Sequence, residues 1–189
     1  FQDKEQLRIG VREMLGKDCI RATAAELSDL AETILAELAS RQAAPLEKRF
    51  GVPYLAEGER AGRRARYALL ALGKLGGREL NYHSDLDLML IYEGDGRTGP
   101  PPEATRFDRC EATDNIHYFT ELAQRIIRAT SHVGPMGRLY QLDMRLRPTG
   151  RSGSLVLPLA EFRRYFAPAD GGAQLWERQA LTRARVVHG

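Results

Sequence analysis

The sequence has few of the features that mark secreted, membrane or metal-scaffold proteins. It contains only two cysteines, Cys19 and Cys110, without the paired spacing of a disulfide framework or a zinc site, so a reducing cytoplasm fits best. No apolar run approaches the roughly 18 residues of a membrane span, and the charged N-terminus has no signal-peptide core. The chain also lacks an initiating methionine, and we therefore expect it to be a fragment of a longer protein.

A strong charge of either sign is also lacking. Charged residues make up 28% of the sequence, but the net charge is only +3, and no basic stripe with interleaved aromatic side chains is present. Such a stripe is typical of RNA-binding surfaces, so its absence argues against nucleic acid as a partner. The four histidines have no metal-ligand spacing, and only His83 lies beside a motif of interest.

The first part of the chain has the spacing of amphipathic helices. One helix is expected over about Lys4–Leu15, and a stronger one in TAAELSDLAETILAELAS, where Thr23 and Glu26 match a capping box. The apolar positions of the second helix recur at helical intervals and are Leu27, Leu30, Ala31, Ile34, Leu35 and Leu38. Pro45 is expected to end it.

Beyond Pro45 the pattern changes to a mixture of strands and helices. RYALLALG and LDLMLIYEG predict buried strands, whereas GDGRTGPPPEA predicts a loop because glycine and proline crowd it. TDNIHYFTELAQRIIRATSH returns to helical spacing. The sequence therefore predicts an α+β fold, with a helical N-terminal segment over residues 1–45 and a second domain over residues 46–189.

The last third of the chain predicts one more strand and two closing helices. RLYQLDMRLRP alternates in polarity, and its apolar face carries Leu142, Met144 and Leu146. The helices are expected at about Leu159–Phe166 and Ala173–Arg185, with Trp176 as a core anchor.

Two aspartates stand at the entrance of an apolar strand. Asp85 and Asp87 share one face, because residues i and i+2 of a strand point the same way. Asp143 lies on the polar face of the later strand, so three carboxylates converge if the two strands are neighbours. Three uncompensated anions repel, and Mg²⁺, which prefers oxygen ligands, would remove that cost. Alternatively, such a pair is solvated at a strand edge or neutralised by arginines.

Residues just upstream favour a phosphate site. Gly76 and Gly77 precede the short RELN segment, and Ser84 stands directly before Asp85. A tight glycine turn lets backbone amides approach phosphate oxygens closely. An ordinary turn would use the same glycines, and this alternative stays open.

Together, the glycine pair, the spacer, Ser-Asp-Leu-Asp on a strand and a later strand aspartate resemble the signature of the polymerase-β-like nucleotidyltransferase superfamily. GKLGGRELNYHSDLDLMLIY, YQLDMRLRPTGRSGSLV and WERQALTRARVVHG are similar to the catalytic domain of the bifunctional glutamine synthetase adenylyltransferase/adenylyl-removing enzymes, from about Leu7 to the last residue. The resemblance implies a mixed sheet flanked by helices within 46–189. It also implies an enzyme that moves adenylyl groups from ATP onto, or off, a tyrosine of glutamine synthetase.

Roles for individual residues follow from the same resemblance. Asp85, Asp87 and Asp143 would be catalytic and would bind Mg²⁺, with two ions expected, and Asp143 would help to take the proton from the attacking hydroxyl. The residues implied for nucleotide and phosphate binding are Gly76, Gly77, Ser84, Lys74, Arg145 and Arg147. The two arginines would stabilise charge on the departing pyrophosphate, although neutralising the acidic cluster is an equally open role for them.

The direction of the reaction stays open at this point. Full-length members of the family resemble two such domains in tandem, one adding the adenylyl group and one removing it by phosphorolysis, and the texture of EQLRIGVREMLGKD and QALTRARVV favours the adding domain. Glutamine synthetase is the expected protein substrate, and a nitrogen-signalling protein would act through parts outside this chain. Neither a membrane nor nucleic acid is expected as a partner. Two alternatives remain: a catalytically silent docking module, and a nucleotidyltransferase for a small molecule or RNA.

Overall fold

The computed structural model describes residues 1–102, 110–134, 137–146, 148, 153–168 and 171–189. Within these residues, no helix combines the length and the apolar character needed to cross a membrane. Cys19 and Cys110 are both free thiols.

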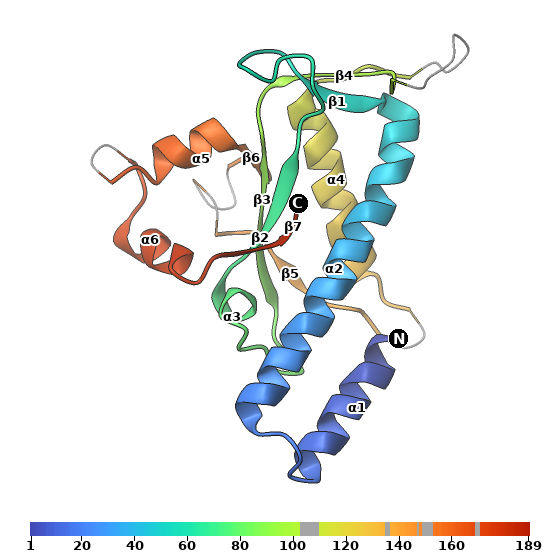
Figure 1. The fold of residues 1–189 in the computed structure, drawn as a ribbon, viewed down its shortest axis with the longest axis vertical. Helices are drawn as coiled ribbons and strands as arrows, with labels where there is room; N and C mark the ends of the chain where they lie inside the picture. Colours follow the sequence, from blue (N-terminus) through green and yellow to red (C-terminus); the bar gives the residue numbers. More distant parts are fainter. Residues whose placement is uncertain (103–109, 135–136, 147, 149–152, 169–170) are drawn as a thin grey trace.

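Two N-terminal helices form an antiparallel hairpin along one side of the molecule (Figure 1). The helix α1 spans Gln2–Met14 and α2 spans Ile20–Phe50, so both predicted N-terminal helices are confirmed. Ile9 of α1 is buried in the main core. The upper part of α2 runs along the sheet, whereas α1 and the lower part of α2 project beyond it.

The predicted end of the second helix is wrong. Instead of stopping at Pro45, α2 continues through it to Phe50. Proline removes one backbone hydrogen bond from a helix interior. Ala39, Leu46 and Phe50 belong to one buried cluster on both sides of Pro45, and this packing outweighs the local loss. The helix crosses residue 45 without a break, and the division of the chain at that residue stays a prediction.

The predicted capping box is also wrong. The helix begins at Ile20 with Cys19 as its N-cap, so Thr23 lies inside the helix and its side chain is buried there. Glu26 pairs with Arg8 of α1 instead of folding back on the helix end. The hairpin contact between the two helices therefore uses the residue that the pattern assigned to a cap.

A five-stranded mixed sheet forms the centre of the fold, in the order β5-β3-β2-β7, with β6 also paired to β3. Its strands are β2 (Tyr67–Ala71), β3 (Leu86–Tyr92), β5 (Leu142–Asp143), β6 (Val156–Pro158) and β7 (Arg185–His188). The strand β2 is antiparallel to β3 and β7, whereas β5 and β6 are parallel to β3. The two predicted buried strands and the α+β class are confirmed.

A second, two-stranded sheet lies at the top of Figure 1, where β1 (Val52–Leu55) pairs with β4 (Gly96–Gly99). The predicted loop GDGRTGPPPEA is therefore wrong over β4, because this glycine-rich segment pairs with a neighbouring backbone. The remaining helices are α3 (Gly73–Gly76), α4 (Asn115–Ser131), α5 (Leu159–Tyr165) and α6 (Leu175–Leu181). The helix α4 confirms the predicted helical spacing.

The C-terminal part contains more strand than predicted. The helix α6 ends at Leu181, and Arg185 begins β7 instead of ending a helix. Val187 packs against the main core while β7 pairs with β2, and a helix would give up both interactions. The predicted anchor Trp176 is 53% exposed, so that prediction is wrong.

The strand predicted in RLYQLDMRLRP is much shorter than its alternation indicated. Among the described residues of this stretch, only Leu142–Asp143 pairs with β3. Leu142 and Met144 belong to the main core, but Leu146 packs into a different cluster, so the three do not share one face. The chain leaves the sheet after Asp143, which places that residue at the end of its strand.

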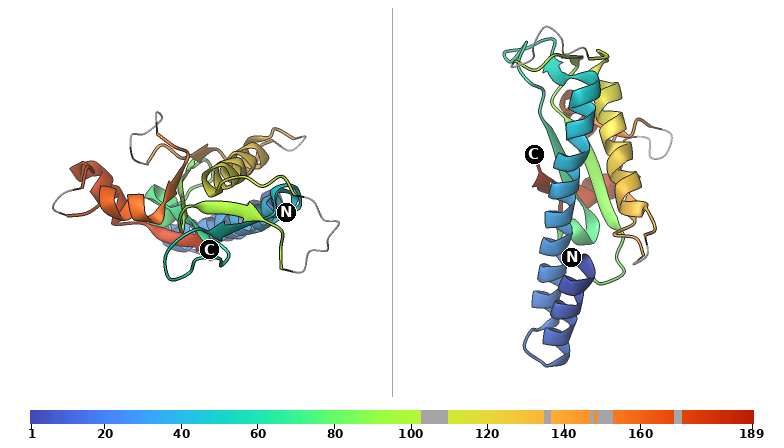
Figure 2. Two further views of the ribbon diagram at one scale, coloured as in Figure 1. Left: turned by 90° about the horizontal axis from the view of Figure 1, so that it is seen from above. Right: turned by 90° about the vertical axis from the view of Figure 1, so that its right-hand side faces the viewer.

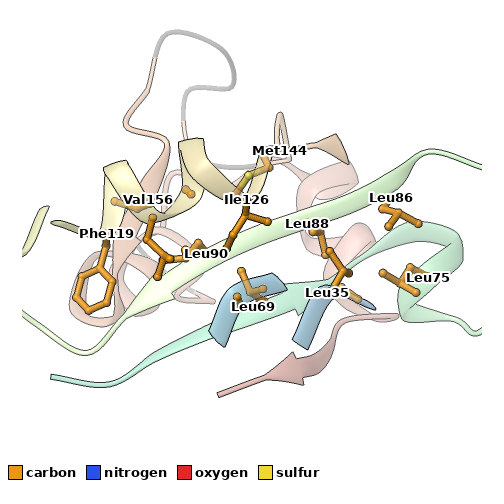
Figure 3. Packing of buried hydrophobic residues seen from close by; sticks show 14 of the residues in the cluster. Leu35, Leu69, Leu75, Leu86, Leu88, Leu90, Phe119, Ile126, Met144 and Val156 are labelled. Atoms are coloured by element: carbon orange, nitrogen blue, oxygen red, sulfur yellow. The ribbon is translucent and has the colours of Figure 1, made fainter. Parts of the chain in front are cut away.

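The two faces of the sheet carry separate apolar clusters. Leu86, Leu88 and Leu90 of β3 pack against α2 and α4, which lie side by side (Figures 2 and 3). Met89 and Ile91 point to the opposite face, toward α5 and α6. Since side chains alternate along a strand, Asp87 belongs to the face of Met89 and Ile91.

Candidate functional site

The three predicted carboxylates gather at one end of β3. Asp87 and Asp143 are register partners on the parallel strands β3 and β5, and Asp85 stands directly before β3. Leu142 and Met144 pack into the main core, so Asp143 between them belongs to the opposite face, as Asp87 does. The condition for the convergence of the carboxylates, that the two strands are neighbours, is thus met.

The neighbouring carboxylates affect the pKa of Asp87. Burial raises its pKa above the ordinary value, and the charges of Asp143 and Asp85 raise it further. Arg145 and Lys74 oppose the shift without cancelling it. The carboxylate of Asp87 thus lies in a field that disfavours its negative charge, and a cation beside it would relieve that cost.

Asp143 is held by an arginine two residues further along the chain. The Nε of Arg145 donates to both carboxylate oxygens, at 2.8 and 2.7 Å, and the backbone amide of Arg145 donates to Oδ1 at 2.9 Å. The guanidinium Nη2 contacts Oδ2 as well. The neutralising role that was open for Arg145 is therefore observed. Arg147 lies outside the described residues.

The donor chemistry of this site suits Mg²⁺, but the side chains do not form a closed cage. Asp85, Asp87 and Asp143 offer the hard carboxylate oxygens that this ion prefers. Within the described parts of the chain, no three side chains of the types that bind metals lie close enough to hold an ion as they stand. Asp143 is engaged by Arg145 instead, and an ion that used Asp143 would compete with this guanidinium.

The glycine pair is placed differently from the expectation. The amides of Gly76 and Gly77 donate to Leu72 and Gly73 within the turn of α3, at 2.9 and 3.1 Å, so these amides are already hydrogen-bonded. Gly76 is buried, and a Cβ there would lie 2.1 Å from the carbonyl oxygen of Arg183. Close packing thus accounts for Gly76, and phosphate binding by this pair stays a prediction.

Two other residues predicted to contact phosphate, Ser84 and Lys74, lie near the carboxylates. Ser84 closes a turn, since its hydroxyl donates to Oδ1 of Asn81 at 2.7 Å. Lys74 is exposed and lies near enough to Asp87 to act on its pKa. Asp85, His83 and Ser84 line one side of a cavity of about 230 Å³ whose other side is formed by residues 138–141. A larger hollow of about 580 Å³ lies at the far end of β3, around residues 55–60 and 93–95.

Sequence reasoning missed two contacts that support this site. Gly73 has a φ of +52°, and it lies directly against the Asp87 carboxylate. Arg185 of β7 donates to the carbonyl of Leu75 at 3.0 Å and pairs with Glu32 of α2. Arg185 thereby ties the end of α3 to α2. The first glycine of GKLGG could have indicated the contact at Gly73. The strand that carries Arg185 could not be recognised, because the sequence predicted a helix up to that residue.

Comparison with known proteins gives matches over the whole chain. A family profile described as "Glutamate-ammonia ligase adenylyltransferase" matches residues 1–189. The bifunctional glutamine synthetase adenylyltransferase/adenylyl-removing enzyme of Thioalkalivibrio sulfidiphilus is 37% identical over 189 residues, which cover 100% of this chain and 18% of that protein. The enzymes of the same description from Pseudomonas aeruginosa and Xanthobacter autotrophicus are each 38% identical, and the matches cover 100% and 99% of this chain.

The chain spans less than a fifth of the length of these relatives, 18% in the first two cases and 17% in the third. The family match, in contrast, leaves no part of the sequence outside it. It agrees with the resemblance that the motifs around Asp85, Asp87 and Asp143 indicated. On this basis the chain belongs to the glutamate-ammonia ligase adenylyltransferase family.

Proposed function

We propose that this chain is a catalytic domain that transfers an adenylyl group from ATP to a tyrosine of glutamine synthetase with the help of Mg²⁺. The observation that carries the proposal is the adjacency of Asp87 and Asp143 in the register of β3 and β5, with Asp85 beside them. Family membership and the printed names of the relatives support the choice of ATP and glutamine synthetase.

All three carboxylates would hold the metal in this proposal. Mg²⁺ bound by Asp85, Asp87 and Asp143 would supply positive charge that offsets both the carboxylates and the triphosphate. Two ions are proposed, and together they would stabilise the charge that develops in an in-line displacement. Asp143 accepts the proton of the attacking tyrosine hydroxyl, whose ordinary pKa of about 10 leaves it protonated at neutral pH.

The reaction balances as a single displacement at phosphorus. The tyrosine oxygen forms a bond to the α-phosphorus of ATP. The bond between the α-phosphorus and the oxygen that bridges to the β-phosphate breaks, and pyrophosphate leaves. Arg145 lies beside Asp143 and is placed to meet negative charge there. The remaining residues proposed to contact the triphosphate are Lys74, Gly76, Gly77, Ser84 and Arg147.

Transfer of label from α-labelled ATP to glutamine synthetase tests this proposal. The wild-type chain with Mg²⁺ is expected to label glutamine synthetase, and the variants Asp85→Asn and Asp87→Asn are expected to lose most of that transfer while staying folded. Undiminished labelling by both folded variants would overturn the assignment. A catalytically silent docking module would bind glutamine synthetase and label nothing.

The reverse direction is the second candidate, because the relatives are named for both adding and removing activities. In that case orthophosphate attacks the adenylyl phosphorus of modified glutamine synthetase, the bond from that phosphorus to the tyrosine oxygen breaks, and ADP and unmodified glutamine synthetase are released. Incubation of adenylylated glutamine synthetase with orthophosphate and Mg²⁺ separates the two directions. ADP release without label transfer would identify a removing domain.

Two further parts of the proposal concern the surroundings of the chain. We place it in the cytoplasm, which its two free thiols support. A nitrogen-signalling protein is proposed to act on the longer protein through regions outside this chain. Label transfer to RNA or to a small molecule in place of glutamine synthetase would redirect the substrate assignment.

A further inference from the structure

The carboxylate of Asp87 fills the space that a side chain at residue 73 would take. The first residue of α3, Gly73, has a φ of +52°, and a Cβ built there would lie 2.2 Å from Oδ2 and 3.2 Å from Cγ of Asp87. The backbone beside them is fixed, because the amide of Leu72 donates to the carbonyl oxygen of Asp87 at 2.9 Å. The carboxylate of Asp87 thus lies where a side chain of residue 73 would otherwise be.

We propose that Gly73 is a positioning residue, whose missing side chain makes the space that sets the direction of the Asp87 carboxylate. The inference rests on the proposed function for its consequence, since a displaced Asp87 would hold Mg²⁺ less well. The contact between Gly73 and the Asp87 carboxylate can be tested without any measurement of activity. Gly73 itself touches neither nucleotide nor metal in this account.

The contact at Gly73 differs from the surroundings of Gly76 and of Gly16. At Gly76, a Cβ would meet backbone atoms of Arg183 and Ala71, so a side chain there disturbs the packing of the main chain. At Gly16, whose φ of +66° is also positive, a Cβ would meet nothing within 4 Å. At Gly73 the three nearest heavy atoms are Oδ2, Cγ and Cβ of Asp87, and the carboxylate group can rotate away. A substitution at Gly73 therefore acts on the direction of Asp87.

Double substitution separates this contact from simple backbone strain. Gly73→Ala is made in the wild-type chain and in Asp87→Ala, and Gly16→Ala in both backgrounds serves as the control for positive φ alone. The measurement is the urea midpoint of unfolding without metal. We expect Gly73→Ala to lower the midpoint more than Gly16→Ala in the wild type, and this excess to vanish in Asp87→Ala.

An excess that persists in Asp87→Ala, or one that is absent from the wild type, would overturn the inference. The functional part is read from the Mg²⁺ concentration that gives half-maximal label transfer. We expect Gly73→Ala to raise it about tenfold or more, as a loss of about 1.4 kcal/mol of ion binding would. Gly16→Ala should leave it unchanged, and an unchanged requirement in Gly73→Ala would refute positioning. If the wild type transfers no label but the midpoints behave as expected, the proposed function fails and the contact stands.

Discussion

Asp87 on β3 and Asp143 on β5 are direct register partners, and Arg145 holds Asp143 at the same time. One carboxylate of the pair is thus neutralised by a cation from the chain, while burial and its neighbours disfavour the charge of the other. The asymmetry suits a site that accepts a further cation beside Asp87. It also yields predictions that need no nucleotide.

Asp87→Asn is expected to stabilise the metal-free chain at neutral pH. Since the folded-state pKa of Asp87 is raised, the folded state binds this proton more tightly than the unfolded state does. Ionised Asp87 therefore lowers the stability of the fold above its raised pKa. This penalty disappears as the pH falls below the pKa that Asp87 has in the unfolded chain. Urea unfolding in EDTA at pH 7 and at acid pH should show an advantage for Asp87→Asn only at the higher pH.

Glu37→Gln is a matched control for that comparison, because Glu37 forms an exposed pair with Arg41 on α2. It should change stability little at pH 7. A lower stability of Asp87→Asn than of the wild type at pH 7, measured without metal, would show that Asp87 is stabilised rather than strained in its ionised form.

Arg145→Gln is expected to move metal binding and transfer in opposite directions. The substitution removes the guanidinium that competes for Asp143, so Mg²⁺ alone should bind several-fold more tightly by calorimetry. Label transfer should fall, because the same arginine is proposed to meet the charge of the departing pyrophosphate. Weaker Mg²⁺ binding in this variant would mean that Arg145 orients Asp143 for the metal instead of competing with it.

Glu32→Gln is expected to destabilise the fold by about 1–2 kcal/mol, because it weakens a charge-assisted pair with Arg185 that is partly buried. Arg185 also donates to the carbonyls of Leu75 and Gly76, so the end of α3 should loosen with it. Glu37→Gln, in an exposed pair, should cost less than about 0.5 kcal/mol. Equal urea midpoints for the two variants would contradict the proposed tie between α2 and α3.

Much of the site follows from local sequence. The apolar run after Asp87 predicted a buried strand. The alternation around Asp143 placed that aspartate on the face of its strand that Leu142 and Met144 do not share. The common face of Asp85 and Asp87 followed from the two-residue period of a strand, and the polar face of Asp143 followed from the alternation around it. Their adjacency depended on strand order, which local patterns do not contain.

Two of the errors in the fold have the same cause, which is tertiary packing that overrides a local signal. Pro45 stays within α2 because Leu46 and Phe50 beyond it are buried in the core. Arg185 enters β7 because β2 offers it a pairing edge, although the preceding sequence has helical character. Tertiary packing is also seen at Gly76, where a Cβ would lie 2.1 Å from the Arg183 carbonyl oxygen, while its phosphate role stays a prediction.

The central claim is that Asp85 and Asp87 hold a metal–nucleotide complex, and calorimetry tests it most directly. ATP should bind the wild-type chain with Mg²⁺ and far more weakly in EDTA. Asp85→Asn/Asp87→Asn should weaken binding of Mg²⁺–ATP about tenfold or more, a loss of at least about 1.4 kcal/mol, while circular dichroism shows an intact fold. Equal affinity of the folded double variant and the wild type, or binding of ATP that does not depend on Mg²⁺, would contradict the account.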